Sequence, residues 1–273
     1  MLAVTAYPIG YAIYLSLQRA DLRFPNQNQW VGLDNYVTVL TASVWWRDVW
    51  HTVLITVVSV SIELVIGMLL ALIMHRAIFG RGLIRTSALV PYGIVTVVAA
   101  FAWRFAFSKA EGGFVPKVLG LSSDPVATTE PFLNYVVVIL TEVWKTTPFM
   151  ALLLLAGLTI VPDELHEAAR VDGASNWQRF WRITVPLMKP AILVALLFRT
   201  LDAFRIFDSV YIISNGNNPN VETVSVLNFN ELLTRLNLGV GSAISVLIFL
   251  MVVFIAFLFV KGFGTSLAQQ RGE

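Results

Sequence analysis

Runs of about twenty apolar residues recur along this chain, and they constrain its fold more than any other feature. An α-helix rises 1.5 Å per residue, so about twenty residues cross the roughly 30 Å hydrocarbon core of a bilayer. The chain is 57% hydrophobic and only 13% charged, with a mean hydropathy of +0.73, which is too apolar for a soluble domain with a polar shell. The composition therefore predicts an all-α protein that crosses a membrane several times.

The apolar runs predict six membrane-spanning helices in a single transmembrane domain of residues 1–273. They are 1–17, 53–74, 86–107, 132–160, 191–213 and 241–260. The first run is short for a crossing, but it lacks the basic start and small-residue cleavage site of a signal peptide, so we expect a helix. Pro91 inside the third run is acceptable where neighbouring helices satisfy the freed carbonyl. The asparagine-rich segment 214–239 is expected to be a loop that can fold back into the membrane.

The distribution of basic residues predicts which connections face the cytoplasm. Segments 75–87, 162–189 and 261–273 together carry nine Lys or Arg in 54 residues. Segments 18–52, 108–133 and 214–238 carry six in 86 residues. Because cytoplasmic loops are enriched in Lys and Arg, the first group is assigned to the cytoplasm.

The longest polar connection, residues 162–190, predicts a helix, a turn and a second helix. Pro162 suits a first helical position, and Gly173 is expected to end the first helix. Ser175 followed by Gln178 has the spacing of a capping box that starts the second helix. Such a hairpin either packs on its own protein or presents a surface for docking.

The same connection carries a longer pattern that resembles a known family. Glu167, Ala168 and Ala169 are followed at fixed intervals by Gly173, Ile183 and Pro186, as in the E-A-A-x(3)-G-x(9)-I-x-L-P loop of ABC importer permeases. Val185 stands where that family has Leu. The resemblance implies that residues 162–190 form a coupling helix in a cleft of an ATP-hydrolysing subunit. The residues expected to couple are Glu167, Ala168, Ala169, Asp172, Gly173, Ile183 and Pro186.

Two further segments are similar to carbohydrate-type members of that family, of the maltose and trehalose kind. WVGLDNY, which begins at Trp30, is similar to the F-x-G-L-D-N-Y entry of these permeases. FRIFDSVYIIS, which begins at Phe204, is similar to their F-x-x-F-D-x-x-Y-x-L-T segment. Gly216 is followed by two asparagines where the family has G-G-P, so details of that loop do not carry over.

Charged residues inside the predicted spans are candidates for a substrate path. Arg199, Asp202, Arg205 and Asp208 follow one another at steps of three, so neighbouring Arg and Asp side chains can pair. Two interpretations stay open, a water-filled path and a self-neutralised helix packed on a partner. The path candidates are Lys145, Asp202, Arg205, Asp208, Asn228 and Asn230.

Several kinds of chemistry lack their sequence signatures. There is no G-x-x-x-x-G-K-[ST] phosphate-binding loop and no G-x-S-x-G serine motif. There is no cysteine, and the three histidines are scattered, which argues against a zinc site. No basic block alternates with aromatic residues, which argues against binding to nucleic acid. We expect a chain that is not an enzyme and binds no metal or cofactor itself.

The resemblance implies one permease subunit, of the first-permease type, in an ATP-driven sugar importer of the inner membrane. Its expected partners are a second permease, two ATPase subunits that bind ATP and Mg²⁺, an extracytoplasmic sugar-binding protein, the sugar and membrane lipid. A disaccharide, trehalose among them, is the expected substrate. The alternatives are an ion-coupled secondary transporter that uses Glu63, Glu142 or Asp202, and a structural scaffold. No inverted repeat is visible between the two halves, which argues against the secondary transporter.

Overall fold

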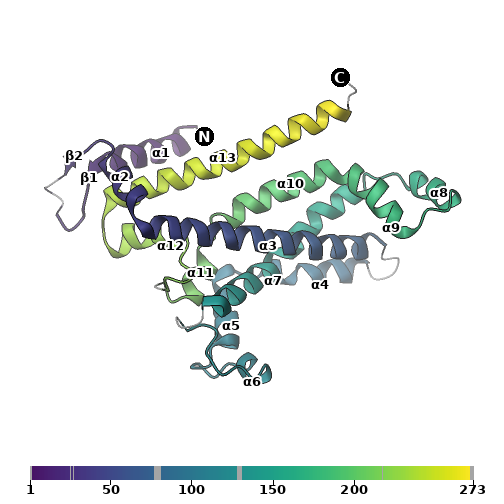
Figure 1. Ribbon diagram of the computed structural model, residues 1–273, viewed down its shortest axis with the longest axis horizontal. Coiled ribbons are helices and arrows are strands. Elements are labelled where there is room, and N and C mark those ends of the chain that lie inside the picture. The colour runs from purple at the N-terminus through teal and green to yellow at the C-terminus, as the bar shows by residue number, and fades with distance from the viewer. Residues whose placement is uncertain are drawn as a thin grey trace. The chain divides into compact units, whose positions relative to one another are not determined.

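Helices make up most of the structure, a computed structural model that describes residues 2–24, 26, 28–76, 81–127, 131–216 and 218–270. The one sheet among these residues is a short antiparallel pair, β1 (Gln18–Arg19) with β2 (Gln29–Trp30). The all-α prediction is therefore confirmed (Figure 1). The helices are α1 (Leu2–Ser16), α2 (Asp34–Thr41), α3 (Ser43–Arg76), α4 (Arg81–Gly93), α5 (Thr96–Phe107), α6 (Val115–Val118), α7 (Pro131–Leu158), α8 (Asp163–Val171), α9 (Asn176–Arg179), η1 (Phe180–Thr184), α10 (Val185–Ala203), α11 (Asp208–Ile213), α12 (Val224–Phe229), η2 (Asn230–Thr234) and α13 (Leu238–Gln270).

Four helical stretches of the described chain are long and apolar enough to cross a membrane. They are Ser43–Arg76, Pro131–Leu158, Asn176–Ala203 and Leu238–Gly262. A fifth crossing is counted if the bent pair Thr86–Gly93 and Thr96–Phe107 forms one span. Helix α1 has 15 residues, about 22 Å, which is less than the hydrocarbon thickness. The predicted first span, 1–17, therefore stays a prediction.

The predicted third span, 86–107, is not one straight helix. It bends by 91° between α4 and α5. Pro91 has no N–H to donate, and Gly93 is a poor helix former, so the helix is weak just before the bend. At the bend the Ile94 N–H donates to the Pro91 carbonyl at 3.3 Å, which is a turn rather than an α-helical bond.

The predicted fifth span, 191–213, also differs, at both ends. Helix α10 begins at Val185, directly after η1, and ends at Ala203. A non-helical segment then separates it from α11 (Asp208–Ile213). Thr223 donates its hydroxyl to the Ile206 carbonyl at 3.2 Å, which satisfies a backbone acceptor that the break leaves free. The predicted loop 214–239 contains two helical turns of its own, α12 and η2.

The chain forms two compact units. The first unit is Met1–Thr56, Ala100–Val138 and Phe204–Ile255, and the second is Val57–Ala99, Ile139–Ala203 and Ala256–Glu273. Inside the first unit, α2, α3, α12 and α13 share an apolar core that includes Trp45, Leu227 and Ile244.

The second unit has its own core between α3, α7 and α10. Its buried side chains include Met74, Met150, Leu154, Met188 and Ala195. Glycine allows the backbones to approach closely, because a Cβ at Gly67 of α3 would lie 2.9 Å from the Met150 Cγ of α7. Small residues and methionines thus bring these three helices together.

Candidate functional site

The predicted hairpin of residues 162–190 is present in the second unit, and it follows α7 directly. Its first arm, α8, begins at Asp163, with Asp163 and Glu164 in the first turn where negative charge favours the helix dipole. Pro162 has an extended conformation, with φ −66° and ψ 133°, and precedes the helix as its N-cap. The expectation that Pro162 is the first helical residue was therefore wrong by one position.

The turn of the hairpin is built as the sequence predicted. Gly173 has a φ of +81°, a left-handed conformation that favours glycine. Around it, the Ala174 N–H donates to the Ala169 carbonyl at 2.8 Å and the Gly173 N–H donates to the Arg170 carbonyl at 3.1 Å. These two bonds are those of a Schellman motif, which ends a helix.

The second arm starts with the predicted capping box. The Ser175 hydroxyl accepts from the Gln178 N–H at 3.3 Å, and the Ser175 N–H donates to the Gln178 side chain at 2.8 Å. From α9 the chain continues through the π-helical turn η1 into α10, so Asn176–Ala203 is one continuous helix. Pro186 has no N–H for the Arg182 carbonyl four residues earlier, which favours a wider turn at this place. The second arm of the hairpin and a membrane-spanning helix are thus parts of one continuous helix.

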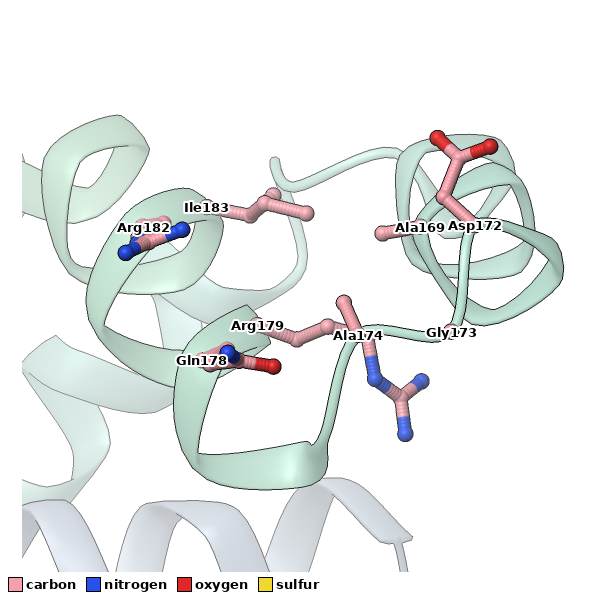
Figure 2. A pocket seen from close by; sticks show the side chains of 8 residues that line it. All are labelled: Ala169, Asp172, Gly173, Ala174, Gln178, Arg179, Arg182 and Ile183. Atoms are coloured by element: carbon pink, nitrogen blue, oxygen red, sulfur yellow. The ribbon is translucent and has the colours of Figure 1, made fainter.

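A cleft of about 390 Å³ lies between α8 and the start of this continuous helix. Its lining includes four of the predicted coupling residues, Ala169, Asp172, Gly173 and Ile183, together with Ala174, Gln178, Arg179 and Arg182. Figure 2 shows the side chains of Ala169 and Ile183 facing each other from the two arms. Small side chains at the turn keep the cleft open.

The outer surface of the hairpin is exposed. No residue of α8, whose side chains are all described, is buried, so Glu167 and Ala168 are accessible. Large apolar side chains are accessible too, with Val171 89%, Trp177 69% and Trp181 51% exposed. Pro186 is also exposed. A cluster of exposed apolar groups on a monomer indicates a surface that binds another molecule.

Arg199 of α10 lies in a largely buried cluster of charges that the sequence predicted only in part. Arg199 pairs with Asp202 at 2.8 Å, as the spacing indicated, but Asp202 is 67% exposed. The buried partners of Arg199 come from other helices, Glu63 of α3 and Glu142 of α7. We call Arg199, Glu63, Glu142 and Asp202 the Arg199 cluster, and it lies wholly in the second unit.

The remaining path candidates fall in two places. Lys145 of the second unit lies over the Tyr92 ring, with its Nζ 5.5 Å from the ring centroid. In the first unit, Arg205 lies in the break after α10 and Asp208 in the first turn of α11. Asn230 donates to the Gly216 carbonyl at 3.1 Å and to Glu222 at 3.0 Å, so its amide holds the loop before α12.

Arg205 and Asn228 line one hollow of about 340 Å³ inside the first unit. Phe207, Phe229, Ser225 and Ser245 also line it. The Asn228 amide donates to the Ser245 hydroxyl at 3.0 Å. The rings of Phe207 and Phe229 lie with their centroids 5.0 Å apart. The hollow therefore combines aromatic faces with hydrogen-bonding groups.

Ser225 and Phe229 of this hollow were missed because segment 214–239 was expected to be a loop. Within a helix, Ser225, Asn228, Phe229 and Leu232 recur at steps of three and four and share one face. That spacing is the signal in the sequence that could have found them.

Comparisons with known proteins identify the family of the chain. The profile of a family described as "Binding-protein-dependent transport system inner membrane component" matches residues 38–268. The Trehalose transport system permease protein SugA of Mycobacterium tuberculosis is 53% identical over 266 residues, covering 97% of this chain and 85% of the relative. The Trehalose/maltose transport system permease protein MalF of Thermococcus litoralis is 39% identical over 257 residues, covering 93% and 86%.

The fold is also that of a solved transporter. A bacterial ABC transporter involved in the import of the acidic polysaccharide alginate matches with a TM-score of 0.78 at 22% identity, covering 95% of this chain and 91% of that one. At this identity the likeness concerns the fold alone. With the family profile covering most of its length, this multi-pass membrane protein belongs to the family of binding-protein-dependent transport system inner membrane components and is a permease subunit, not an enzyme.

Proposed function

We propose that this chain is a permease subunit of an ATP-driven importer for a disaccharide of the trehalose type, in the inner membrane. The observation that carries the proposal is the exposed α8–α9 hairpin, which continues without a break into a membrane-spanning helix. The relatives named for trehalose and maltose transport support the substrate class.

In this proposal the hairpin docks on an ATP-hydrolysing subunit. Trp177, Trp181 and Val171 supply exposed apolar area, and burying such area is the main driving force of association. The cleft lined by Ala169, Gly173 and Ile183 offers a place where a partner side chain can enter. Asp172 lines the cleft just after α8, and Glu167 and Ala168 are exposed on α8 itself. Pro186 lies where η1 passes into α10.

The proposed sugar route includes the hollow at Arg205 and Asn228. A sugar presents hydroxyl groups on its rim and C–H groups on its faces, so it binds where aromatic rings and hydrogen-bonding side chains converge. Phe207 and Phe229 supply the rings, and Asn228 supplies the amide. Asp202, Asp208, Lys145 and Asn230 stay further candidates for contacts along the route.

The complete importer in this proposal also contains a second permease, two ATPase subunits and an extracytoplasmic sugar-binding protein. ATP and Mg²⁺ belong to the ATPase subunits. Glu63, Glu142 and Asp202, the acids that an ion-coupled transporter would use, all lie against the Arg199 guanidinium. This pairing disfavours their use as an ion-coupling site.

The test is reconstitution of the chain in proteoliposomes with the proposed second permease, ATPase and sugar-binding protein. We expect uptake of radiolabelled trehalose that requires both ATP and the binding protein. The permease alone, assayed under the same conditions, is the control and should neither hydrolyse ATP nor accumulate sugar. Uptake driven by a proton or sodium gradient without the ATPase would overturn the proposal.

A further inference from the structure

The helix that carries the hairpin ends a few residues after a buried arginine. Asn176–Ala203 is one continuous helix, with Trp177 at one end and Arg199 near the other. At 1.5 Å per residue these two positions are about 33 Å apart along the axis. A movement of the hairpin is therefore transmitted to Arg199 along one continuous helix.

Arg199 binds two other helices at that end. Its Nε lies 2.5 Å from Glu63 Oε2 and its Nη2 lies 3.0 Å from Glu63 Oε1, so the guanidinium holds the carboxylate of α3 with two bonds. The same Nη2 donates to Glu142 Oε2 of α7 at 3.2 Å. Thr146 of α7 donates its hydroxyl to Glu63 at 2.8 Å, which ties α3 to α7 as well.

All members of the Arg199 cluster except Asp202 are enclosed by protein. The side chains of Arg199, Glu63 and Glu142 are 1%, 0% and 8% exposed. A buried carboxylate held by both nitrogens of a guanidinium fork has a defined geometry, and lysine cannot reproduce that fork. The cluster therefore fixes the position of α10 against α3 in both distance and orientation.

The other contacts of α10 with its neighbours are of a different kind. They include Met188, Ile192, Ala195 and Leu196, which belong to the same apolar core of the second unit as Met150 and Leu154. Methionine is flexible and fills gaps of varied shape, and alanine has little side chain to interlock. Apolar packing of this kind is non-directional, so it holds the helices together without the directed bonds of the fork.

We propose that Arg199 is a positioning residue that carries movement of the α8–α9 hairpin into α3 and α7. When the helix Asn176–Ala203 moves, the bonds from the Arg199 guanidinium to Glu63 move α3 with it. The bonds of Glu142 to Arg199 and of Thr146 to Glu63 move α7 in the same way. Without the fork, α10 is held by apolar packing in place of directed bonds to α3 and α7, and ATP hydrolysis is no longer matched to transport. This inference rests on the proposed function, because it requires that the hairpin docks on an ATPase.

The test measures sugar molecules transported per ATP hydrolysed in the reconstituted importer. Arg199→Lys keeps the charge and loses the fork, and we expect the ratio to fall at least fivefold while the subunits still copurify. Phe198→Leu changes the neighbouring position, which is 56% exposed and lies outside the Arg199 cluster, and it should keep the wild-type ratio.

A second variant separates positioning from stability. Glu63→Leu/Glu142→Met/Arg199→Met replaces the buried charges by apolar groups of similar size, a kind of change that often preserves folding. We expect an assembled complex that hydrolyses ATP with a strongly reduced ratio. A wild-type ratio in either variant would overturn the inference, and so would loss of assembly in both, since the cluster would then act only in folding. If the wild-type complex transports without ATP hydrolysis, the proposed function fails instead.

Discussion

Gly157 of α7 and Ala191 of α10 touch so closely that a Cβ on Gly157 would lie 2.5 Å from the Ala191 Cβ. The hairpin leaves α7 just after Gly157 and returns into α10 just before Ala191. This contact therefore brings together the two helices that support the hairpin.

Gly157→Ala is expected to destabilise the second unit. The added methyl group has no space, and overpacking of this kind costs about 1–3 kcal/mol. The midpoint of thermal unfolding in detergent should fall relative to the wild type. Gly10→Ala is the matched control, because nothing lies within 4 Å of a Cβ at that position of α1. Equal midpoints for the two variants would contradict the packing.

Gly173→Val is expected to weaken binding of the ATPase. A left-handed conformation costs a residue with a side chain about 1–2 kcal/mol, and valine is a poor candidate for it. The turn should distort, so less ATPase should copurify with the permease. Gly173→Asn is the control, since asparagine tolerates this conformation better than other residues. If the valine variant retained as much ATPase as the asparagine variant, the turn geometry would not matter for docking.

Glu167→Ala is expected to lower trehalose uptake in the reconstituted importer. Glu167 is exposed on α8, so removing it leaves the fold intact and alters only the surface offered to the ATPase. Uptake and ATPase copurification are measured together. Glu164→Ala, which removes another acid from the same helix, serves as the comparison. A Glu167 variant that binds the ATPase and transports at the wild-type rate would remove it from the coupling surface.

Asp202→Asn and Asp208→Asn test the proposed sugar route. Asp202 is 67% exposed and Asp208 lies in the first turn of α11, so both variants should assemble. We expect a changed dependence of uptake rate on sugar concentration, because each carboxylate would accept hydrogen bonds from sugar hydroxyl groups. Unchanged uptake by well-assembled variants, or loss of assembly, would take these residues off the route.

The hairpin could be predicted from the sequence because its signals are local. Gly173 and the Ser175–Gln178 capping box each act on residues within a few positions, and both have the predicted structure. The Arg199 cluster could not be predicted in the same way. Arg199 and Glu63 are 136 positions apart, and only packing of α10 on α3 brings them together. The spacing of three residues within α10 predicted only the pairing of Arg199 with Asp202, which is the exposed partner.

The break between α10 and α11 was missed for a related reason. No proline or glycine marks residues 204–207. The segment is stabilised from a distance, by the bond from Thr223 to the Ile206 carbonyl. An uninterrupted apolar run predicts one helix unless a hydrogen-bond partner that stabilises a break from elsewhere in the chain is known.

Docking of the hairpin on an ATP-hydrolysing subunit can be tested directly by cross-linking. The chain has no cysteine, so a single cysteine can be introduced without background. Val171→Cys, 89% exposed on α8, carries a short photoactivatable cross-linker in the assembled importer, and Val118→Cys, 77% exposed on α6, is the control. We expect a cross-link to the ATPase from position 171 and none from position 118; a cross-link from position 171 only to the permease itself would contradict docking of the hairpin on the ATPase.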